Sequence, residues 1–192
     1  IRPLCRLAST LPVCATLIPA ALAAEDVTVF AAASLKSALD ELIKVYPGDT
    51  IHIAYGGSSS LTRQVMQGAP AQLFISANQS WMDILERDGF LIENSRMDLL
   101  GNRLALVAAP DTTVQLPPAP GFDLATAIGD GVLAMALVKA VPAGIYGKQA
   151  LTTLGDWGGV KGKIAQADNV RAALRLVASG EASIGVVYAT DL

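Results

Sequence analysis

The chain is organised around the segment Val27-Thr28-Val29-Phe30-Ala31-Ala32-Ala33-Ser34-Leu35-Lys36-Ser37-Ala38-Leu39. Its first half predicts a strand that ends in small residues and leads through Ser34 into a helix. Beyond Ser34 the apolar residues recur at i, i+3, i+4, i+7, i+8 and i+11, which is typical of a helix with one buried face. These residues are Leu35, Ala38, Leu39, Leu42, Ile43 and Tyr46. Two roles stay open for Ser34. It caps its own helix, or its hydroxyl and the free N–H groups of the first turn bind an anion.

The same alternation of strand and helix continues along the chain. We expect strands at 27–33, 50–55, 73–77, 102–109, 131–138 and 184–188. We expect helices at 35–46, 61–67, 123–128, 143–154 and 170–179, and one that starts near Ser80 and stops at Gly89. This order predicts an α/β fold with a parallel-type sheet and helices on both of its faces. Ligands bind such sheets at the carboxyl ends of the strands, so the loops that leave the strands are where a site is expected.

Composition and charge exclude several classes of protein. The chain has 192 residues, of which 52% are hydrophobic and 16% charged, and a net charge of −3. This suits one large or two small globular lobes. Nucleic acid is not expected as a partner, because binding a phosphate backbone needs clustered Lys and Arg. The sequence has a single histidine, His52, and no cluster of His, Cys or carboxylate residues with metal-ligand spacing. We therefore expect no bound metal ion and no cofactor.

Residues 1–24 have the pattern of a secretory signal peptide. A positively charged start is followed by an apolar stretch from 11 to 22 and by an A-x-A cleavage site at Ala21-Leu22-Ala23. The stretch is too short and too interrupted by proline to span a membrane. Both cysteines, Cys5 and Cys14, lie in this leader, so we expect an exported mature chain without a disulfide.

Three further loops resemble the one at Ser34. Each opens a predicted helix: Gly56-Gly57-Ser58-Ser59-Ser60, Val141-Pro142-Ala143-Gly144 and Asp168-Asn169-Val170. Together with the loop at Ser34, two of the four lie in each half of the chain. A helix N-terminus behaves as roughly +0.5 charge, so four that converge would supply about +2. The pattern therefore predicts a site for a doubly charged oxyanion.

The loop at Ser58 also suggests an enzyme. Gly56-Gly57-Ser58-Ser59-Ser60 resembles the G-x-S-x-G turn of serine hydrolases except at its last position. A hydrolase also needs a histidine, and His52 lies in the strand that leads to this turn, too near in sequence for the usual order. An exported serine hydrolase is kept as the less favoured alternative. A third class, the effector-binding domain of a transcription regulator, would need a DNA-binding segment where the leader stands.

Several motifs together resemble the periplasmic molybdate-binding proteins of bacterial ABC importers. They run in order from about residue 25 to the end of the chain: Phe30-Ala31-Ala32-Ala33-Ser34-Leu35, Gly68-Ala69-Pro70-Ala71, Leu73-Phe74-Ile75-Ser76-Ala77, Leu99-Leu100-Gly101-Asn102, Val141-Pro142-Ala143-Gly144-Ile145-Tyr146 and Gly185-Val186-Val187-Tyr188. The resemblance implies a two-lobed periplasmic-binding-protein fold of type II with the ligand cleft between the lobes. It also implies a monomeric, non-enzymatic periplasmic protein that delivers molybdate or tungstate to the membrane permease of an ABC transporter.

The resemblance also implies the residues of the site. The serine ligands correspond to Ser34 and Ser58, the backbone donors of the second lobe to Ala143 and Val170, and the tyrosine hydroxyl to Tyr188. Molybdenum would be held only as its oxyanion through these residues, with no direct metal-ion ligand. Sulfate remains an alternative ligand, because it too is an unprotonated dianion and only the size of the pocket separates the two.

The two halves of the chain repeat one architecture, with a boundary near residue 102. This pattern predicts a first lobe at 25–102 and a second lobe at 103–192, with a cleft between them. The chain of the family continues past the position of Leu192 and returns to the first lobe. We therefore expect this sequence to lack the closing C-terminal segment of that lobe.

Overall fold

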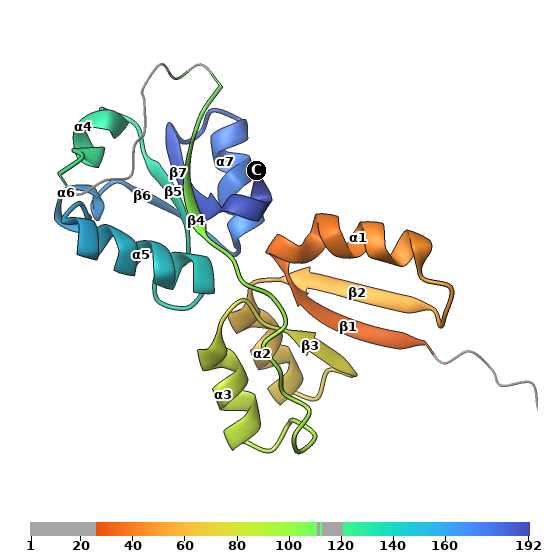
Figure 1. Ribbon diagram of the computed structural model, residues 1–192. Coiled ribbons are helices and arrows are strands. Elements are labelled where there is room, and N and C mark those ends of the chain that lie inside the picture. Colours follow the sequence, from red (N-terminus) through yellow and green to blue (C-terminus); the bar gives the residue numbers. More distant parts are fainter. Residues whose placement is uncertain (1–25, 111, 113–120) are drawn as a thin grey trace, which may run out of the picture.

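The computed structural model describes residues 26–110, 112 and 121–192, in which the strands form two separate sheets (Figure 1). The first sheet has the order β2-β1-β3, and all its strands are parallel: β1 (Val27–Ala32), β2 (Ile51–Gly56) and β3 (Leu73–Ile75). The second has the order β4-β7-β5-β6: β4 (Leu104–Ala108), β5 (Leu133–Ala136), β6 (Ile164–Ala167) and β7 (Ile184–Tyr188). The predicted signal peptide lies outside the described residues.

Helices follow most of the strands, as the sequence pattern predicts. A 3-10 turn (Ala33–Leu35) leads into α1 (Lys36–Val45), and the others are α2 (Ser58–Met66), α3 (Gln79–Arg87), α4 (Leu124–Ile128), α5 (Pro142–Leu154), α6 (Trp157–Val160) and α7 (Val170–Ala178). A second 3-10 turn (Ala189–Asp191) follows β7. The sequence did not predict α6 or β6. The helix expected at 61–67 begins three residues earlier, at Ser58.

The second sheet is covered on both faces. Side chains alternate along β5, so that Leu133 and Met135 pack in one apolar cluster with α4, α5 and α6. Ala134 faces the opposite side and packs against Ala173 and Val177 of α7. This is the layered α/β arrangement that the alternation of elements predicts.

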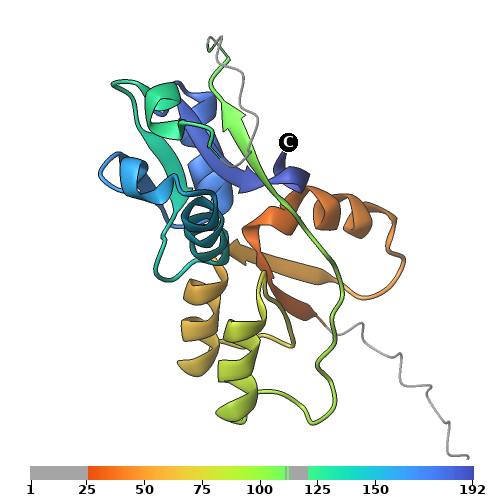
Figure 2. The ribbon, with the colours of Figure 1, turned by 60° about the vertical axis from the view of Figure 1, so that its left-hand side comes forward.

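One strand departs from the predicted parallel sheet. Leu104 pairs with Tyr188 and Ala108 with Ile184, so β4 runs antiparallel to β7. The reason is its connection, because β4 is reached from α3 at the first sheet by the long segment at 88–103 rather than by a helix of its own sheet (Figures 1 and 2). An antiparallel strand needs no crossover helix.

The helix α1 is more exposed than its periodicity predicts. None of its residues is fully buried, and Leu42, Val45 and Tyr46 are among the exposed large apolar side chains, with Val45 76% exposed. The predicted buried face is therefore wrong for Ala38, Leu42 and Tyr46, because no described element covers that side of the helix. In the described part of the chain no helix is long and apolar enough to cross a membrane.

Candidate functional site

A narrow cavity between the two halves brings together all five residues that the sequence nominates. Ser34, Ser58, Ala143, Val170 and Tyr188 line it together with Ala32, Ala33, Gly56, Gly57, Ala77, Val141, Pro142 and Asn169. The starts of α2, α5 and α7 and the 3-10 turn before α1 thus meet at one place, as the four similar loops predict. The cavity has a volume of about 10 Å³, close to the least that holds one water molecule.

Ser34 does not cap a helix. It lies inside the 3-10 turn that follows β1, and the helix α1 begins two residues later, after Leu35. Neither the turn nor α1 has a side-chain cap. The capping role considered for Ser34 is therefore wrong, and this buried residue lines the cavity instead.

Ser58 is the first residue of α2 and is only 1% exposed. The preceding Gly57 has no side chain that could cap the helix. The Oγ atom of Ser58 accepts a hydrogen bond from the backbone N–H of Ala77 at 3.0 Å. Because an oxygen that accepts this bond still has its own proton, the hydroxyl of Ser58 remains able to donate into the cavity.

The two helix starts of the second half differ in how they are capped. In α5, Pro142 occupies the first turn and Val141 makes no side-chain cap, so the buried Ala143 lies in an uncapped first turn. In α7, the side chain of Asn169 accepts the N–H of Ala172 at 3.0 Å. Val170, the first residue of α7, remains on the cavity wall.

Tyr188 contributes a buried hydroxyl. The residue ends β7 and is 5% exposed, and its hydroxyl has no hydrogen-bond partner among the residues that the structure describes. A buried polar group without a partner is costly, and it calls for a functional explanation. Burial raises the pKa of Tyr188, and Tyr146 and Asp191 raise it further. The hydroxyl therefore keeps its proton at neutral pH and acts as a donor.

Sequence reasoning missed two places where the halves approach each other closely. The indole N–H of Trp81, in α3, donates to the carbonyl of Ala140 at 2.9 Å. A Cβ atom on Gly57 would lie 2.5 Å from the carbonyl oxygen of Asp168. Both contacts join segments that are far apart in sequence, so no local pattern indicates them.

The geometry does not support a hydrolase. The partner of the Ser58 hydroxyl is the N–H of Ala77, not a base. His52, in β2, has an exposed side chain 3.5 Å from the carboxylate of Asp26 and is not among the residues that line the cavity. Within the residues that the structure describes, no group of three or more His, Cys, Asp or Glu could hold a metal ion.

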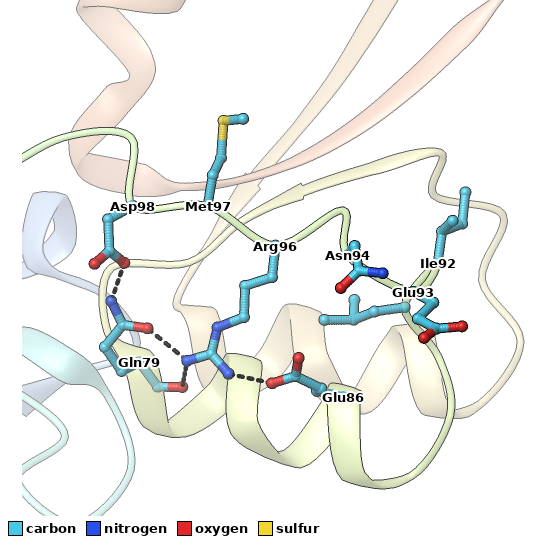
Figure 3. A pocket seen from close by; sticks show the side chains of 9 residues that line it. Gln79, Glu86, Ile92, Glu93, Asn94, Arg96, Met97 and Asp98 are labelled. Atoms are coloured by element: carbon cyan, nitrogen blue, oxygen red, sulfur yellow. Dashed lines mark hydrogen bonds and ion pairs between the residues drawn. The ribbon is translucent and has the colours of Figure 1, made fainter.

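A larger hollow of about 590 Å³ lies along α3 and the segment that follows it. Figure 3 shows Arg96 directed at Gln79 and Glu86, with Asp98 beside Gln79. Arg96 also forms an ion pair with Asp83 at 2.7 Å. An anion here would have to displace carboxylates from the one guanidinium among the lining residues, so this hollow is a poor anion site.

Known proteins similar to this chain are solute-binding proteins. The family model of bacterial extracellular solute-binding proteins matches residues 27–192. The molybdate-binding protein ModA of Haemophilus influenzae is 38% identical over 173 residues, which are 88% of this chain and 68% of that protein. ModA of Escherichia coli is 42% identical over 170 residues, or 86% of this chain and 66% of that protein. The chain thus spans about two thirds of the length of these curated relatives.

A solved structure agrees with these relatives. The periplasmic molybdate-binding protein of Azotobacter vinelandii matches with a TM-score of 0.71 and 26% sequence identity, over 84% of this chain and 71% of that chain. The likeness extends across both sheets, because the matched share is larger than either half of the chain.

Proposed function

Because this chain belongs to the bacterial extracellular solute-binding proteins, and among them to the molybdate-binding proteins, we propose that it captures molybdate in the cavity between its two sheets. The family consists of binding proteins and not of enzymes. Tungstate, which has the same shape and charge, is proposed as a second ligand.

The chemistry of the cavity wall favours an oxyanion that carries no proton. Molybdate is a dianion at neutral pH, so each group that contacts it must donate a hydrogen bond. Ser34, Ser58 and Tyr188 supply hydroxyl groups, and the starts of α5 and α7 supply backbone N–H groups with their positive dipole ends. None of the residues that line the cavity carries a charge. A carboxylate there would repel the ligand.

The observation that carries the proposal is the hydroxyl of Tyr188. A buried donor that has no partner among the described residues calls for an acceptor. Tyr188 lines the same cavity as the two serines and the two helix starts. A bound oxyanion would accept its proton.

Capture requires the two halves to move. We propose that they act as two lobes, 25–102 and 103–192, that close on the ligand. A tetrahedral oxyanion is larger than one water molecule. The volume of the cavity must therefore be larger with the ligand than the 10 Å³ of this arrangement. The ligand bridges donors from both lobes and so favours the closed state over an open one.

The cellular role follows from the family. We propose that the protein acts as a monomer in the periplasm, reached through the signal peptide at 1–24, and hands its ligand to the membrane permease of an ABC transporter. Support comes from the molybdate-binding relatives and from the periplasmic protein of Azotobacter vinelandii.

Thermal unfolding with a panel of anions tests the ligand. A ligand at 100 times its dissociation constant adds about 2.7 kcal/mol to the free energy of unfolding. Molybdate and tungstate are expected to raise the melting temperature of the mature chain, and sulfate and phosphate are not. A shift with sulfate alone would favour a sulfate-binding protein. No shift with any of the four would contradict the proposal.

A further inference from the structure

One guanidinium links three of the segments around the cavity. Arg171 lies in the first turn of α7, directly after Val170. Its Nε atom is 2.6 Å from Oδ1 of Asp191, in the 3-10 turn after β7. Its Nη2 group donates to the hydroxyl of Ser37 at 3.1 Å. Ser37 lies in the first turn of α1, in the other half of the molecule. The end of the chain lies beside the start of α1 in both views of the ribbon (Figures 1 and 2).

Asp191 is a buried carboxylate. Its side chain is 0% exposed, and its Oδ2 atom accepts the backbone N–H of Tyr188 at 3.1 Å. Burial raises the pKa of Asp191, whereas the N–H of Tyr188 and the charge of Arg171 act in the opposite direction. A buried charge is tolerated only when it is paired and hydrogen-bonded, and Arg171 is its cationic partner.

The carboxylate is hydrogen-bonded to the backbone of a residue that lines the proposed anion site. That residue is Tyr188. Charges interact more strongly inside a protein than in water, so an unpaired Asp191 that is ionised would repel a dianion in the cavity. The guanidinium removes this repulsion without entering the cavity, because Arg171 is not among the lining residues.

We propose that Arg171 is a positioning residue for anion capture. Its guanidinium neutralises the carboxylate of Asp191, which is hydrogen-bonded to the backbone of Tyr188. Its contact with Ser37 joins the start of α7 to the start of α1 when the lobes are closed. The inference rests on the proposed function, because it assumes that the cavity holds a dianion. It differs from a purely structural ion pair in one respect. The charge of Asp191 must affect the affinity for an anion, and not only the stability of the fold.

The experiment measures molybdate affinity by calorimetry for the wild type, R171M, D191N and the double variant. The measurement is made at about pH 8 and again at about pH 9, because burial raises the pKa of Asp191 and the loss of Arg171 raises it further. It is made at a temperature at which all four are folded. R171M is expected to bind about tenfold more weakly or worse, within the range of coupling between neighbouring charged groups. The double variant, which has no buried charge, is expected to recover to within about threefold of the wild type.

Two further variants separate the two contacts of Arg171, the ion pair with Asp191 and the hydrogen bond to Ser37. S37A removes only the contact to α1 and is expected to weaken binding by about twofold to threefold, a change typical of an exposed hydrogen bond. R171K keeps the positive charge but not the planar fork, so it should resemble S37A. R175M removes an exposed arginine of the same helix and should bind like the wild type.

The outcomes are distinct for the two proposals. Recovery of affinity in the double variant supports the role of Arg171. Wild-type affinity in R171M, or a double variant as weak as R171M, overturns it while the proposed function stands. If R171M does not fold, a tenfold loss in R171K or in the double variant overturns it. A wild-type protein that binds none of the panel anions overturns both proposals.

Discussion

At the scale of single residues, the most informative group is the hydroxyl of Tyr188. Desolvation of this group without a partner costs about 1–3 kcal/mol in the ligand-free protein. Tyr188→Phe removes that cost and removes one donor to the anion. We expect a melting temperature at least as high as that of the wild type, and molybdate affinity about tenfold lower. Calorimetry of unfolding and of binding checks both. A variant that unfolds several degrees earlier would show that the hydroxyl has a structural partner.

The two serines are expected to differ from Tyr188 and from each other. A hydrogen bond to a charged group contributes about 1.5–3 kcal/mol, so Ser34→Ala and Ser58→Ala should each weaken binding about tenfold to a hundredfold. Only Ser58→Ala also leaves the N–H of Ala77 without its acceptor, so it alone should lower the free energy of unfolding, by about 1 kcal/mol. Urea unfolding separates the two. Unchanged affinity in both variants would contradict the site.

At the scale of secondary-structure elements, the start of α5 depends on a close approach to the end of β5. A Cβ atom on Gly144 would lie 2.3 Å from the carbonyl oxygen of Ala136. Helix propensity favours alanine over glycine by about 1 kcal/mol. Gly144→Ala is nevertheless expected to destabilise the protein by about 1–3 kcal/mol, as overpacking does, and to move Ala143 away from the cavity. Urea unfolding and anion titration measure the two effects.

The control for this prediction is another glycine of the second half. Gly158 lies in α6, and a Cβ atom there would meet nothing within 4 Å. Gly158→Ala should therefore leave both stability and binding as they are, or raise stability slightly. Equal behaviour of the two variants would show that the contact with Ala136 has no consequence.

Local patterns predicted most elements and the four segments that meet at the cavity. Each of the four helix starts is encoded within a few residues: the strand ends before Ser34 and Ser58, the proline at the start of α5, and the loop before Val170. The structure brings these four helix starts to one cavity. The proposed role of Tyr188 rests on the family resemblance and not on a local pattern. Residue type does not distinguish a core tyrosine from a binding one, and only the unpartnered hydroxyl does.

What the sequence missed depends on contacts between distant segments. The short strand β6 forms by pairing with β5, from Leu133 with Ile164 to Ala136 with Ala167, and its own four residues have no strong pattern. The direction of β4 is determined by the segment that reaches it from α3. Periodicity predicts which face of α1 is apolar, but not whether another element covers it.

At the scale of the whole molecule, contacts at separate points hold the two halves close around the cavity. Trp81 of α3 reaches the carbonyl of Ala140, and Arg171 of α7 reaches Ser37 of α1. Between them, Gly57 lies against Asp168 and Val141. The proposed closure would therefore not depend on the ligand alone. These contacts reduce the free energy that the anion must supply to favour the closed state.

A side chain at position 57 is expected to keep the lobes apart. A Cβ atom would lie 2.5 Å from the Asp168 oxygen and 3.3 Å from Cγ2 of Val141, and valine adds two methyl groups beyond it, more than a slightly wider cleft can hold. The backbone of Gly57 is extended, with φ −67° and ψ 133°, so valine causes no strain within its own lobe.

If Gly57→Val reduces the closed population tenfold, apparent molybdate affinity falls by about the same factor. Solution scattering should then show a larger ligand-free radius, and loss of the Trp81 hydrogen bond should change its fluorescence. Gly162→Val, in open space, is the control. An unchanged radius with full affinity would mean that the lobes close without this contact.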